Sequence, residues 1–251
     1  MSNLLFDHFR FVLHKTSHPG NIGAAARAIK TMGFGRLVLA NPNGGPAVLN
    51  DPEAIAFASG AVDVLTTAVV TPDLVTALND VHFTIALTAR TREYGPPYTL
   101  PRESAEFAVQ QASMGAVIAF IFGCERTGLL NVDVERCNLL VHIPTGPMYS
   151  SLNLSQAVQL IAYEVGLACG SAPVTKISSL SRKILATHDD VEGMLLHFER
   201  ALIDLGFLDP VNPQKLMTRL RCLFARSNLE QEEVNILRGI SKHILERKIV
   251  K

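Results

Sequence analysis

The sequence predicts an α/β domain built on a mostly parallel sheet, followed by a small all-α extension. Strand-like and helix-like runs alternate through the first two-thirds of the 251 residues, as in folds whose parallel strands are joined by helices. The run 116–122 (AVIAFIF) is apolar without a break, which is typical of a central strand buried on both faces. Beyond residue 170 only helical patterns recur. We therefore expect a domain over 1–170, a linker over 171–187 and a helical extension over 188–251.

Apolar periodicity and turn-forming residues set the expected bounds of each element. The expected strands are Phe9–Leu13, Arg36–Ala40, Thr67–Val70, Phe83–Leu87, Ala116–Phe122 and Leu139–Ile143. The expected helices of the first domain are Ile22–Met32, Pro52–Ser59, Asp73–Asn79, Ala105–Ala112 and one from Leu154. Those of the extension are Asp189–Leu205, Asn212–Arg226 and Leu229–Arg247. Between the two parts, residues 170–181 are rich in Ser, Pro, Gly and Thr, as linkers are.

Composition narrows the class of protein. Apolar residues make up 48% of the chain and charged residues 18%, which allows a sizeable core. The net charge is zero, which argues against a surface coated in nucleic acid. The charge is mildly uneven along the chain. Up to residue 170 there are ten Lys and Arg and thirteen Asp and Glu, a net charge of −3. After residue 170 there are thirteen Lys and Arg and ten Asp and Glu, a net charge of +3.

The longest uncharged apolar stretch, Met114–Cys124, is too short to cross a bilayer. The chain does not open with a basic segment followed by an apolar stretch, so we expect no signal peptide. The four cysteines form no CxxC pair, so we expect reduced thiols in a cytoplasmic protein without a membrane partner.

The stretch from Ile143 to Ala157 (IPTGPMYSSLNLSQA) places small and polar residues between an apolar strand and an apolar helix. A plain turn needs far fewer of them, so we expect a loop that wraps a ligand. Ser150, Ser151 and Asn153 would deliver hydroxyl and amide groups. Ser151 or Asn153 could instead cap the following helix, and the two roles are compatible. No GxSxG elbow marks a serine nucleophile.

Two other loops are expected to meet this one. Parallel α/β sheets bind ligands at the carboxyl ends of their strands, where the loops after Leu87, Phe122 and Ile143 lie. Gly123 and Glu125 directly follow a buried strand. The glycine would allow close contact between the backbone and a flat ligand, and the acid could receive a ribose hydroxyl or a helix-end amide.

The run Asn21–Arg27 (NIGAAAR) lies where the first strand gives way to the first helix. Gly23 and three alanines would let another backbone or a ligand approach closely. Plain helix packing, with Arg27 on a solvated face, is the alternative. Asn21 and Arg27 point into the same end of the sheet only if Asn21 lies in the loop before the helix, and the expected start at Ile22 meets that condition.

Two other patterns carry no function. Gly33-Phe34-Gly35 precedes a strand, whereas a dinucleotide fingerprint must follow one and has a third glycine. His14 and His18 are four residues apart but at a strand end, so we expect no metal site there.

Three segments together resemble the motifs of the SpoU branch of the SPOUT RNA methyltransferases, and their order and separations match as well. They are Asn21–Ala28, Phe122–Leu129 and Ile143–Val158. The extension resembles that of the TrmJ family, bacterial tRNA 2′-O-methyltransferases acting in the anticodon loop, through Ala201–Pro210, Leu216–Arg226 and Glu233–Gly239. The resemblance implies a deep trefoil knot near the carboxyl end of the α/β domain. It also implies S-adenosylmethionine as methyl donor and a homodimer with the active site near the subunit interface.

The resemblance further implies roles for individual residues. Asn21 and Arg27 match positions that the family uses for substrate and catalysis, and Glu125 matches an acid with a structural or catalytic role. Ser151 and Asn153 would also lie near the reacting ribose. The positions at the donor are Leu87, Thr88, Ala89, Gly123, Ile143, Ser150, Ser151 and Leu152.

The implied activity is 2′-O-methylation of a ribose in tRNA, at cytidine or uridine 32 of the anticodon loop. A sulfonium methyl is already a strong electrophile, so we expect no metal; the enzyme must hold the 2′-oxygen in line with the methyl. We expect the Arg27 guanidinium to stabilise the developing alkoxide, or to position a phosphate that accepts the proton. Ser151 and Asn153 would orient the oxygen.

Three alternatives remain open at this point. The substrate could be ribosomal RNA or another tRNA position, or the chain could be a non-catalytic RNA-binding protein that kept the fold. A Rossmann oxidoreductase is the third, although its fingerprint is missing. For the tRNA methyltransferase that the resemblance implies, we expect the helical extension and the dimer to form the RNA surface jointly, with binding that weakens as salt rises.

Overall fold

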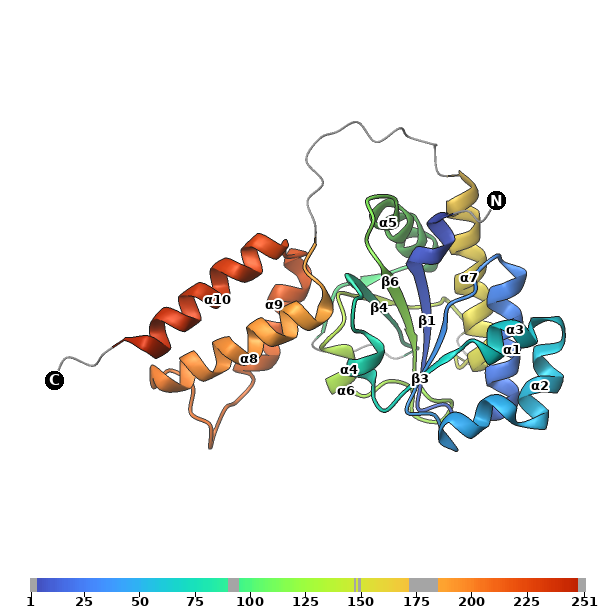
Figure 1. Ribbon diagram of the computed structural model, residues 1–251, viewed down its shortest axis with the longest axis horizontal. Helices are drawn as coiled ribbons and strands as arrows, with labels where there is room; N and C mark the ends of the chain where they lie inside the picture. Colours follow the sequence, from blue (N-terminus) through green and yellow to red (C-terminus); the bar gives the residue numbers. More distant parts are fainter. Residues whose placement is uncertain (1–3, 90–94, 147, 149, 172–184, 248–251) are drawn as a thin grey trace.

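The computed structural model describes residues 4–89, 95–146, 148, 150–171 and 185–247. At its centre is a seven-stranded sheet in the order β3-β2-β1-β6-β4-β7-β5, in which every strand pair is parallel (Figure 1). The strands are β1 (Phe9–His14), β2 (Leu37–Ala40), β3 (Val69–Thr71), β4 (Phe83–Leu87), β5 (Tyr98–Thr99), β6 (Ile118–Phe122) and β7 (Leu139–Val141). The expected parallel sheet is therefore confirmed.

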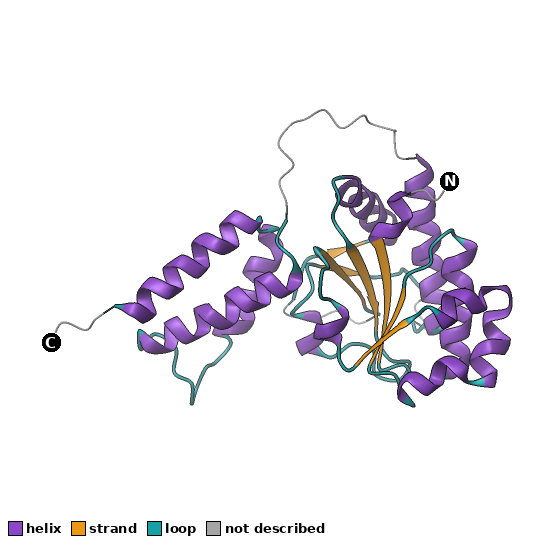
Figure 2. Ribbon diagram, viewed as in Figure 1, coloured by secondary structure: helices purple, strands orange, loops and turns teal. Residues whose placement is uncertain are grey.

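Helices cover both faces of this sheet (Figure 2). They are α1 (Pro19–Thr31), α2 (Pro52–Ala58), α3 (Val62–Thr66), α4 (Leu74–Ala77), α5 (Pro101–Ser113), α6 (Asn131–Val134) and α7 (Leu154–Ser171). Short 3₁₀ turns occupy Leu4–His8, Gly45–Asn50 and Ser59–Ala61. Helices α1, α2, α3, α5 and α7 pack on one face, and α4 and α6 on the other.

The central strands divide their side chains between two cores because successive residues of a strand face opposite ways. On β1, Phe9, Phe11 and Leu13 enter the larger core beneath α1 and α7, whereas Val12 enters the smaller one beneath α4. Phe11 stacks on Phe120 of β6, with ring centroids 5.9 Å apart. All five residues of β6 are buried, which confirms the expected central strand.

Three short elements were not expected: β5, α3 and α6. The first is a two-residue edge strand and the others are helices of five and four residues, too short to show a period. The expected start of α9 (Leu216–Ser227) at Asn212 was wrong. Asn212 precedes Pro213, and a residue before proline is driven out of the helical region.

The extension consists of α8 (His188–Asp204), α9 and α10 (Gln231–Glu246). These helices share a small core of their own, centred on Met194, Leu195 and Val234. The expected linker, 171–187, falls largely on residues outside those described. The division into domains stays a prediction, as does the trefoil knot.

The extension meets the α/β domain at a set of polar contacts that we call the tail junction. The Glu192 carboxylate accepts hydrogen bonds from Arg136, at 2.9 Å, and from Arg221. The backbone N–H of His188 donates to the carbonyl of Val81 (2.7 Å), and the Asn138 amide donates to a carbonyl of α9 (3.0 Å). Val81 and Asn138 precede β4 and β7, so the tail junction lies at the amino ends of these strands.

Across the described part of the chain, no helix combines the length and the apolarity needed to cross a membrane. All four cysteines are free thiols.

Candidate functional site

A cavity of about 430 Å³ opens at the carboxyl ends of β4, β6 and β7. We call it the strand-end cavity. Its lining includes all eight residues expected at the donor: Leu87, Thr88, Ala89, Gly123, Ile143, Ser150, Ser151 and Leu152. The three loops converge because the strands of a parallel sheet all have their carboxyl ends on the same side of the sheet.

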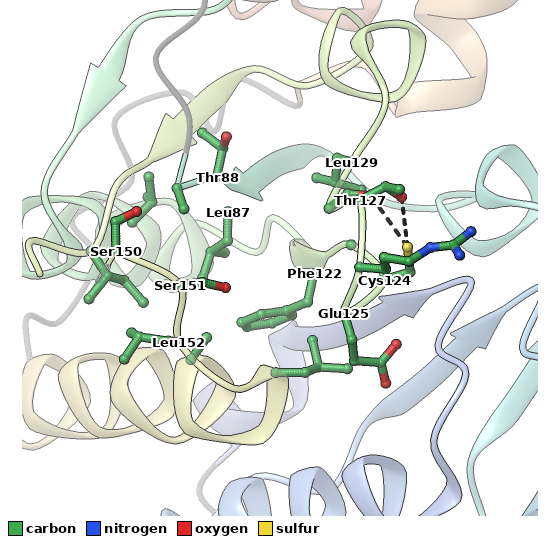
Figure 3. Close-up of a pocket in the computed structure, with 18 residues that line it drawn as sticks. Leu87, Thr88, Phe122, Cys124, Glu125, Thr127, Leu129, Ser150, Ser151 and Leu152 are labelled. Carbon is green, nitrogen blue, oxygen red and sulfur yellow. Dashed lines mark hydrogen bonds between the residues drawn. The ribbon is translucent and has the colours of Figure 1, made fainter. Parts of the chain in front are cut away.

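The walls of the strand-end cavity combine apolar surface with hydroxyl groups. Figure 3 shows Ser150, Ser151 and Leu152 on one side and Thr127 and Leu129 facing them across the opening. The Ser151 hydroxyl points toward the ring of Phe122. Apolar walls with a few placed polar groups are typical of pockets for small organic ligands.

Gly123 is required by the loop that follows β6. A Cβ atom on it would lie 2.2 Å from the carbonyl carbon of Gly128 and 2.3 Å from the amide nitrogen of Leu129. The loop closes on itself through a hydrogen bond from the Gly128 N–H to the Cys124 carbonyl (2.9 Å), with Gly128 at φ +66°. The loop's own backbone therefore already requires a glycine here, and contact between Gly123 and a ligand in the strand-end cavity stays a prediction.

Glu125 is part of the wall of the strand-end cavity, but its carboxylate is directed to the start of α1. Its carboxylate points away from Ser151 (Figure 3). It accepts hydrogen bonds from the Ser17 N–H (3.1 Å) and hydroxyl (2.9 Å), and from the His18 N–H (3.3 Å). A fourth comes from the Asn21 amide (2.9 Å). A carboxylate at this place also complements the positive end of the helix.

The protonation of Glu125 follows from these contacts. Burial raises the pKa of the carboxyl group, but the hydrogen bonds from Asn21, from its own backbone N–H and from Ser17 outweigh burial. The net pKa lies below its ordinary value. Glu125 is therefore a carboxylate near neutral pH, and it acts as an acceptor of hydrogen bonds.

A chain of side-chain hydrogen bonds continues from Glu125 and links all three motifs. The Asn21 amide nitrogen donates to Glu125, and the Asn21 oxygen accepts from the Asn153 amide nitrogen at 2.9 Å. The Asn153 oxygen accepts from the Ser155 N–H (2.8 Å) and hydroxyl (2.7 Å), so Asn153 caps α7. We call this chain the Glu125–Asn21–Asn153 relay.

The two ends of the relay fix the orientation of both amides. A carboxylate only accepts hydrogen bonds, so Asn21 must present its NH₂ group to Glu125. A backbone N–H only donates, so Asn153 must present its oxygen to Ser155. The remaining oxygen of Asn21 and NH₂ of Asn153 then face each other. The helix cap that the sequence offered for Asn153 is found, and its oxygen is occupied by that role.

Arg27 lies apart from the strand-end cavity. Helix α1 begins at Pro19, because proline fits the first turn of a helix. Asn21 is therefore inside the helix, and the condition for Asn21 and Arg27 to point into the same end of the sheet is not met. Six residues along a helix correspond to about 9 Å and a rotation of about 120° away from the starting direction. Within the described residues the exposed guanidinium of Arg27 makes no ion pair.

Gly23 serves the packing of α1 against α2. A Cβ atom on it would lie 2.0 Å from the carbonyl oxygen of Ala54. Of the two possibilities raised by the sequence, the approach of another backbone is the one found.

Several lining residues were not singled out from the sequence. Cys124, Thr127 and Leu129 lie within the second motif and line the strand-end cavity, so the motif itself was the available signal. Burial raises the pKa of the Cys124 thiol, but hydrogen bonds from Thr127 and from the backbone of Arg126 bring it below its ordinary value. Ser17 was missed because nothing in the sequence showed that Glu125 would reach the loop after β1.

Metal-binding groups do not gather in the part of the chain that the structure describes, where no three His, Cys, Asp or Glu side chains are placed to hold an ion.

Comparison with known proteins agrees with this architecture. The model of the SpoU rRNA Methylase family matches residues 8–163, and that of the tRNA methyltransferase TrmJ, C-terminal domain, matches residues 189–251. One relative is the tRNA (cytidine/uridine/adenosine-2′-O-)-methyltransferase TrmJ of Pseudomonas aeruginosa (strain UCBPP-PA14). It is 43% identical over 94% of this chain and 93% of its own length.

A second relative, the tRNA (cytidine/uridine-2′-O-)-methyltransferase TrmJ of Photorhabdus laumondii, is 41% identical over 94% of this chain and 96% of its own. Among solved structures, TrmJ from Z. mobilis ZM4 superimposes with a TM-score of 0.81 at 30% identity, covering 94% of this chain and 99% of that one. The extension is thus matched as well as the sheet, and the chain belongs to the SpoU methylase family and, within it, to the TrmJ group.

Proposed function

We propose that the chain is an S-adenosylmethionine-dependent tRNA 2′-O-methyltransferase that modifies cytidine or uridine 32 in the anticodon loop. One observation carries the proposal: the three motifs converge on the strand-end cavity, and the Glu125–Asn21–Asn153 relay links them there. The names of relatives that are 41 to 43% identical over most of the chain support tRNA as substrate and the ribose 2′-oxygen as acceptor.

The strand-end cavity fits a nucleoside-like donor. Its volume of about 430 Å³ falls within the range of about 300 to 1,000 Å³ typical of small-molecule pockets. Leu87, Ile143 and Leu152 offer apolar contacts for a flat base, and the hydroxyls of Thr88 and Ser150 offer hydrogen bonds to polar groups. When bound, S-adenosylmethionine supplies an electrophilic methyl group on a sulfonium.

The chain's own residues would position the acceptor and keep the donor loop in shape. Ser151 projects its hydroxyl into the strand-end cavity (Figure 3), where it could hydrogen bond with the 2′-oxygen. Asn153 holds the start of α7 and, through it, the loop that carries Ser151. Its role here is positioning, because both its oxygen and its nitrogen already have partners.

Arg27 is proposed to act on the substrate from outside the strand-end cavity. Its exposed guanidinium, in this proposal, stabilises the developing alkoxide or positions a phosphate that accepts the proton. Because it lies apart from the cavity of its own chain, we propose that the active site forms near the interface of a homodimer.

The surface of α7 supports this dimer. Leu160, Tyr163 and Leu167 recur at helical spacing and are between 40% and 46% exposed. The same helix lines the strand-end cavity with Leu154 and Ala157. A second copy packed on this face would therefore lie beside the cavity. We further propose that the enzyme works in the cytoplasm, and that residues 1–170 and 188–251 are separate domains.

The test is to incubate the protein with unmodified tRNA and radiolabelled S-adenosylmethionine, and to map the methylated ribose. We expect label at nucleotide 32. Label elsewhere in tRNA, or in ribosomal RNA offered in parallel, would support the alternative substrates. RNA binding without transfer would indicate a non-catalytic protein. Binding of a nicotinamide dinucleotide in a titration would favour the oxidoreductase.

A further inference from the structure

A second hollow, of about 620 Å³, shares the segment Cys124–Arg126 with the strand-end cavity as a common wall. We call it the basic hollow. Its other walls are Lys15, Ser17 and His18, which follow β1, and Asn43, which follows β2. Whatever occupies it lies one backbone segment away from the proposed donor.

Two cations, Lys15 and Arg126, and one acid, Glu125, line the basic hollow, so that its formal charge is +1 with His18 neutral. Lys15, His18 and Arg126 are all exposed. In the part of the chain described, none of the three forms an ion pair. The charge of Lys15 helps to lower the pKa of Asp133. The Asp133 carboxylate, however, lies 3.5 Å from the Nε2 atom of His14 and forms no ion pair with Lys15.

Glu125, the acid that lines the basic hollow, offsets one of these positive charges but forms no ion pair with Lys15 or Arg126 among the described residues. Glu125 directs its oxygens to the N–H and hydroxyl donors of Ser17, His18 and Asn21. The hydrogen-bonding capacity of Glu125 is therefore used at the start of α1. The N–H donors of Lys15 and Arg126 stay available to a ligand in the basic hollow.

The backbone that presents Lys15 is held in an unusual conformation. Lys15 has φ +55°, a left-handed value that is unfavourable for a residue with a side chain. Two backbone hydrogen bonds keep it there, from the Lys15 N–H to Ala40 and from the Asn43 N–H to Thr16, each 2.9 Å long. Glycine would adopt this backbone conformation with less strain. A need for the positive charge at this position would explain why a lysine is present instead.

We infer that the basic hollow binds phosphate groups of the RNA strand that carries the target ribose, and this inference rests on the proposed function. A ribose in an RNA strand has a phosphate on each side. A ribose held at the common wall therefore places a phosphate at the basic hollow. Arg126 can bind two phosphate oxygens at once, Lys15 contributes a point charge, and the Asn43 amide adds a neutral donor.

The test compares three variants that each lose one positive charge: Lys15→Gln, Arg126→Gln and, as matched control, Arg36→Gln. Arg36 is exposed and immediately precedes β2. It therefore lies at the amino ends of the strands, whereas the basic hollow lies at their carboxyl ends. The affinity for an unmodified tRNA transcript is measured by fluorescence anisotropy at several salt concentrations. The affinity for S-adenosylmethionine is measured by calorimetry, and thermal unfolding checks the fold.

The slope of log affinity against log salt concentration is negative, and each lost phosphate contact makes it shallower by about 0.7 to 0.9. The same loss weakens binding by roughly three- to fivefold at moderate salt. We expect both test variants to show this and the Arg36→Gln protein to match the wild type. For Lys15→Gln, whose residue does not line the donor cavity, the KM for tRNA should rise while kcat at saturating tRNA changes little.

Two results would overturn the inference: an unchanged salt slope in both test variants, or an equal loss in the Arg36→Gln protein. Donor affinity lost in step with RNA affinity would assign Arg126 to the donor instead. The result for Lys15→Gln would then decide whether the basic hollow binds phosphate, because Lys15 lines this hollow and not the strand-end cavity. If the wild-type protein itself neither binds nor methylates tRNA, the proposed function fails, a result distinct from failure of this inference.

Discussion

Two glutamates hold together two different parts of this molecule, and they do so by opposite means. Glu125 joins the loops at the carboxyl ends of the strands through neutral donors: backbone N–H groups, a hydroxyl and an amide. Glu192 joins the extension to the amino ends of the strands through two arginines, Arg136 and Arg221. Glu125 forms no ion pair with the neighbouring Lys15 and Arg126 among the described residues, whereas Glu192 forms ion pairs with both of its arginines.

The difference matches the tasks of the two places. A surface that must bind a polyanion needs cations without internal partners, and neutral donors around Glu125 provide this at the basic hollow. A junction that must hold two parts of a chain together needs partners that satisfy one another. Removing one member of a largely buried ion pair leaves its partner uncompensated, which is costly.

The largest expected effect comes from breaking the tail junction. Glu192→Ala should cost about 3 kcal/mol of stability, because Arg136 and Arg221 lose their common acceptor while partly buried. The measurement is denaturant unfolding followed by a probe in each part of the chain, with exposed Glu232→Ala as control. We expect the extension to unfold first in the Glu192 variant. Coincident transitions with unchanged midpoints would show that the ion pairs contribute little.

Next in size is the loss of the Glu125 carboxylate. Glu125→Gln replaces one acceptor oxygen by an NH₂ group that faces other donors, and should cost about 1 to 3 kcal/mol. Unlike the Glu192 variant, it should also weaken binding of S-adenosylmethionine, because the second motif lines the strand-end cavity. Exposed Glu106→Gln is the matched control. Donor affinity equal to that of the wild type would contradict the link between the Glu125–Asn21–Asn153 relay and the cavity.

A smaller effect separates the two roles of Asn153. Asn153→Ala removes the cap of α7 and should cost about 1 kcal/mol. Asn153→Asp keeps an oxygen for the Ser155 N–H but sets a second oxygen against Asn21. Its stability should stay near that of the wild type, while methyl transfer falls with the Glu125–Asn21–Asn153 relay broken. Equal activity of the Asp variant and the wild type would reduce Asn153 to a helix cap.

The smallest effect is in the dependence of stability on pH. The folded pKa of Glu125 is lower than its ordinary value of 4.5, so its contribution to stability is complete above that value. It disappears as the pH falls through the lower, folded pKa. Unfolding free energies of the wild type and of Glu125→Gln, measured between pH 7 and pH 3, should therefore converge at acid pH. A gap that widens toward acid pH would mean that the sign of the shift is wrong.

Strand ends were predictable from the sequence, and side-chain partners were not. The strand-end cavity contains every residue expected at the donor, because a parallel sheet brings its carboxyl ends together whatever the loops contain. The Glu125–Asn21–Asn153 relay depends on rotamers and on the exact start of α1. Pro19 was the available signal for that start, which lies three residues before the expected one at Ile22 and places Asn21 inside the helix.

Glycine shows the same limit. Gly123 and Gly23 were recognised as points of close approach, yet the sequence did not say what approaches them. Both turn out to face the protein's own backbone. The two-residue strand β5 and the four-residue helix α6 escaped notice because a period cannot be recognised in so few residues.

The anchoring of α8 at the carbonyl of Val81 sets a minimum reach for the substrate. Val81 precedes the first residue of β4, whereas Leu87 ends that strand at the cavity. Five residues of a strand span about 17 Å. About five stacked nucleotides, at about 3.4 Å each, span this distance. An RNA that engages both the cavity and the extension of the same subunit must therefore continue well beyond its target nucleotide.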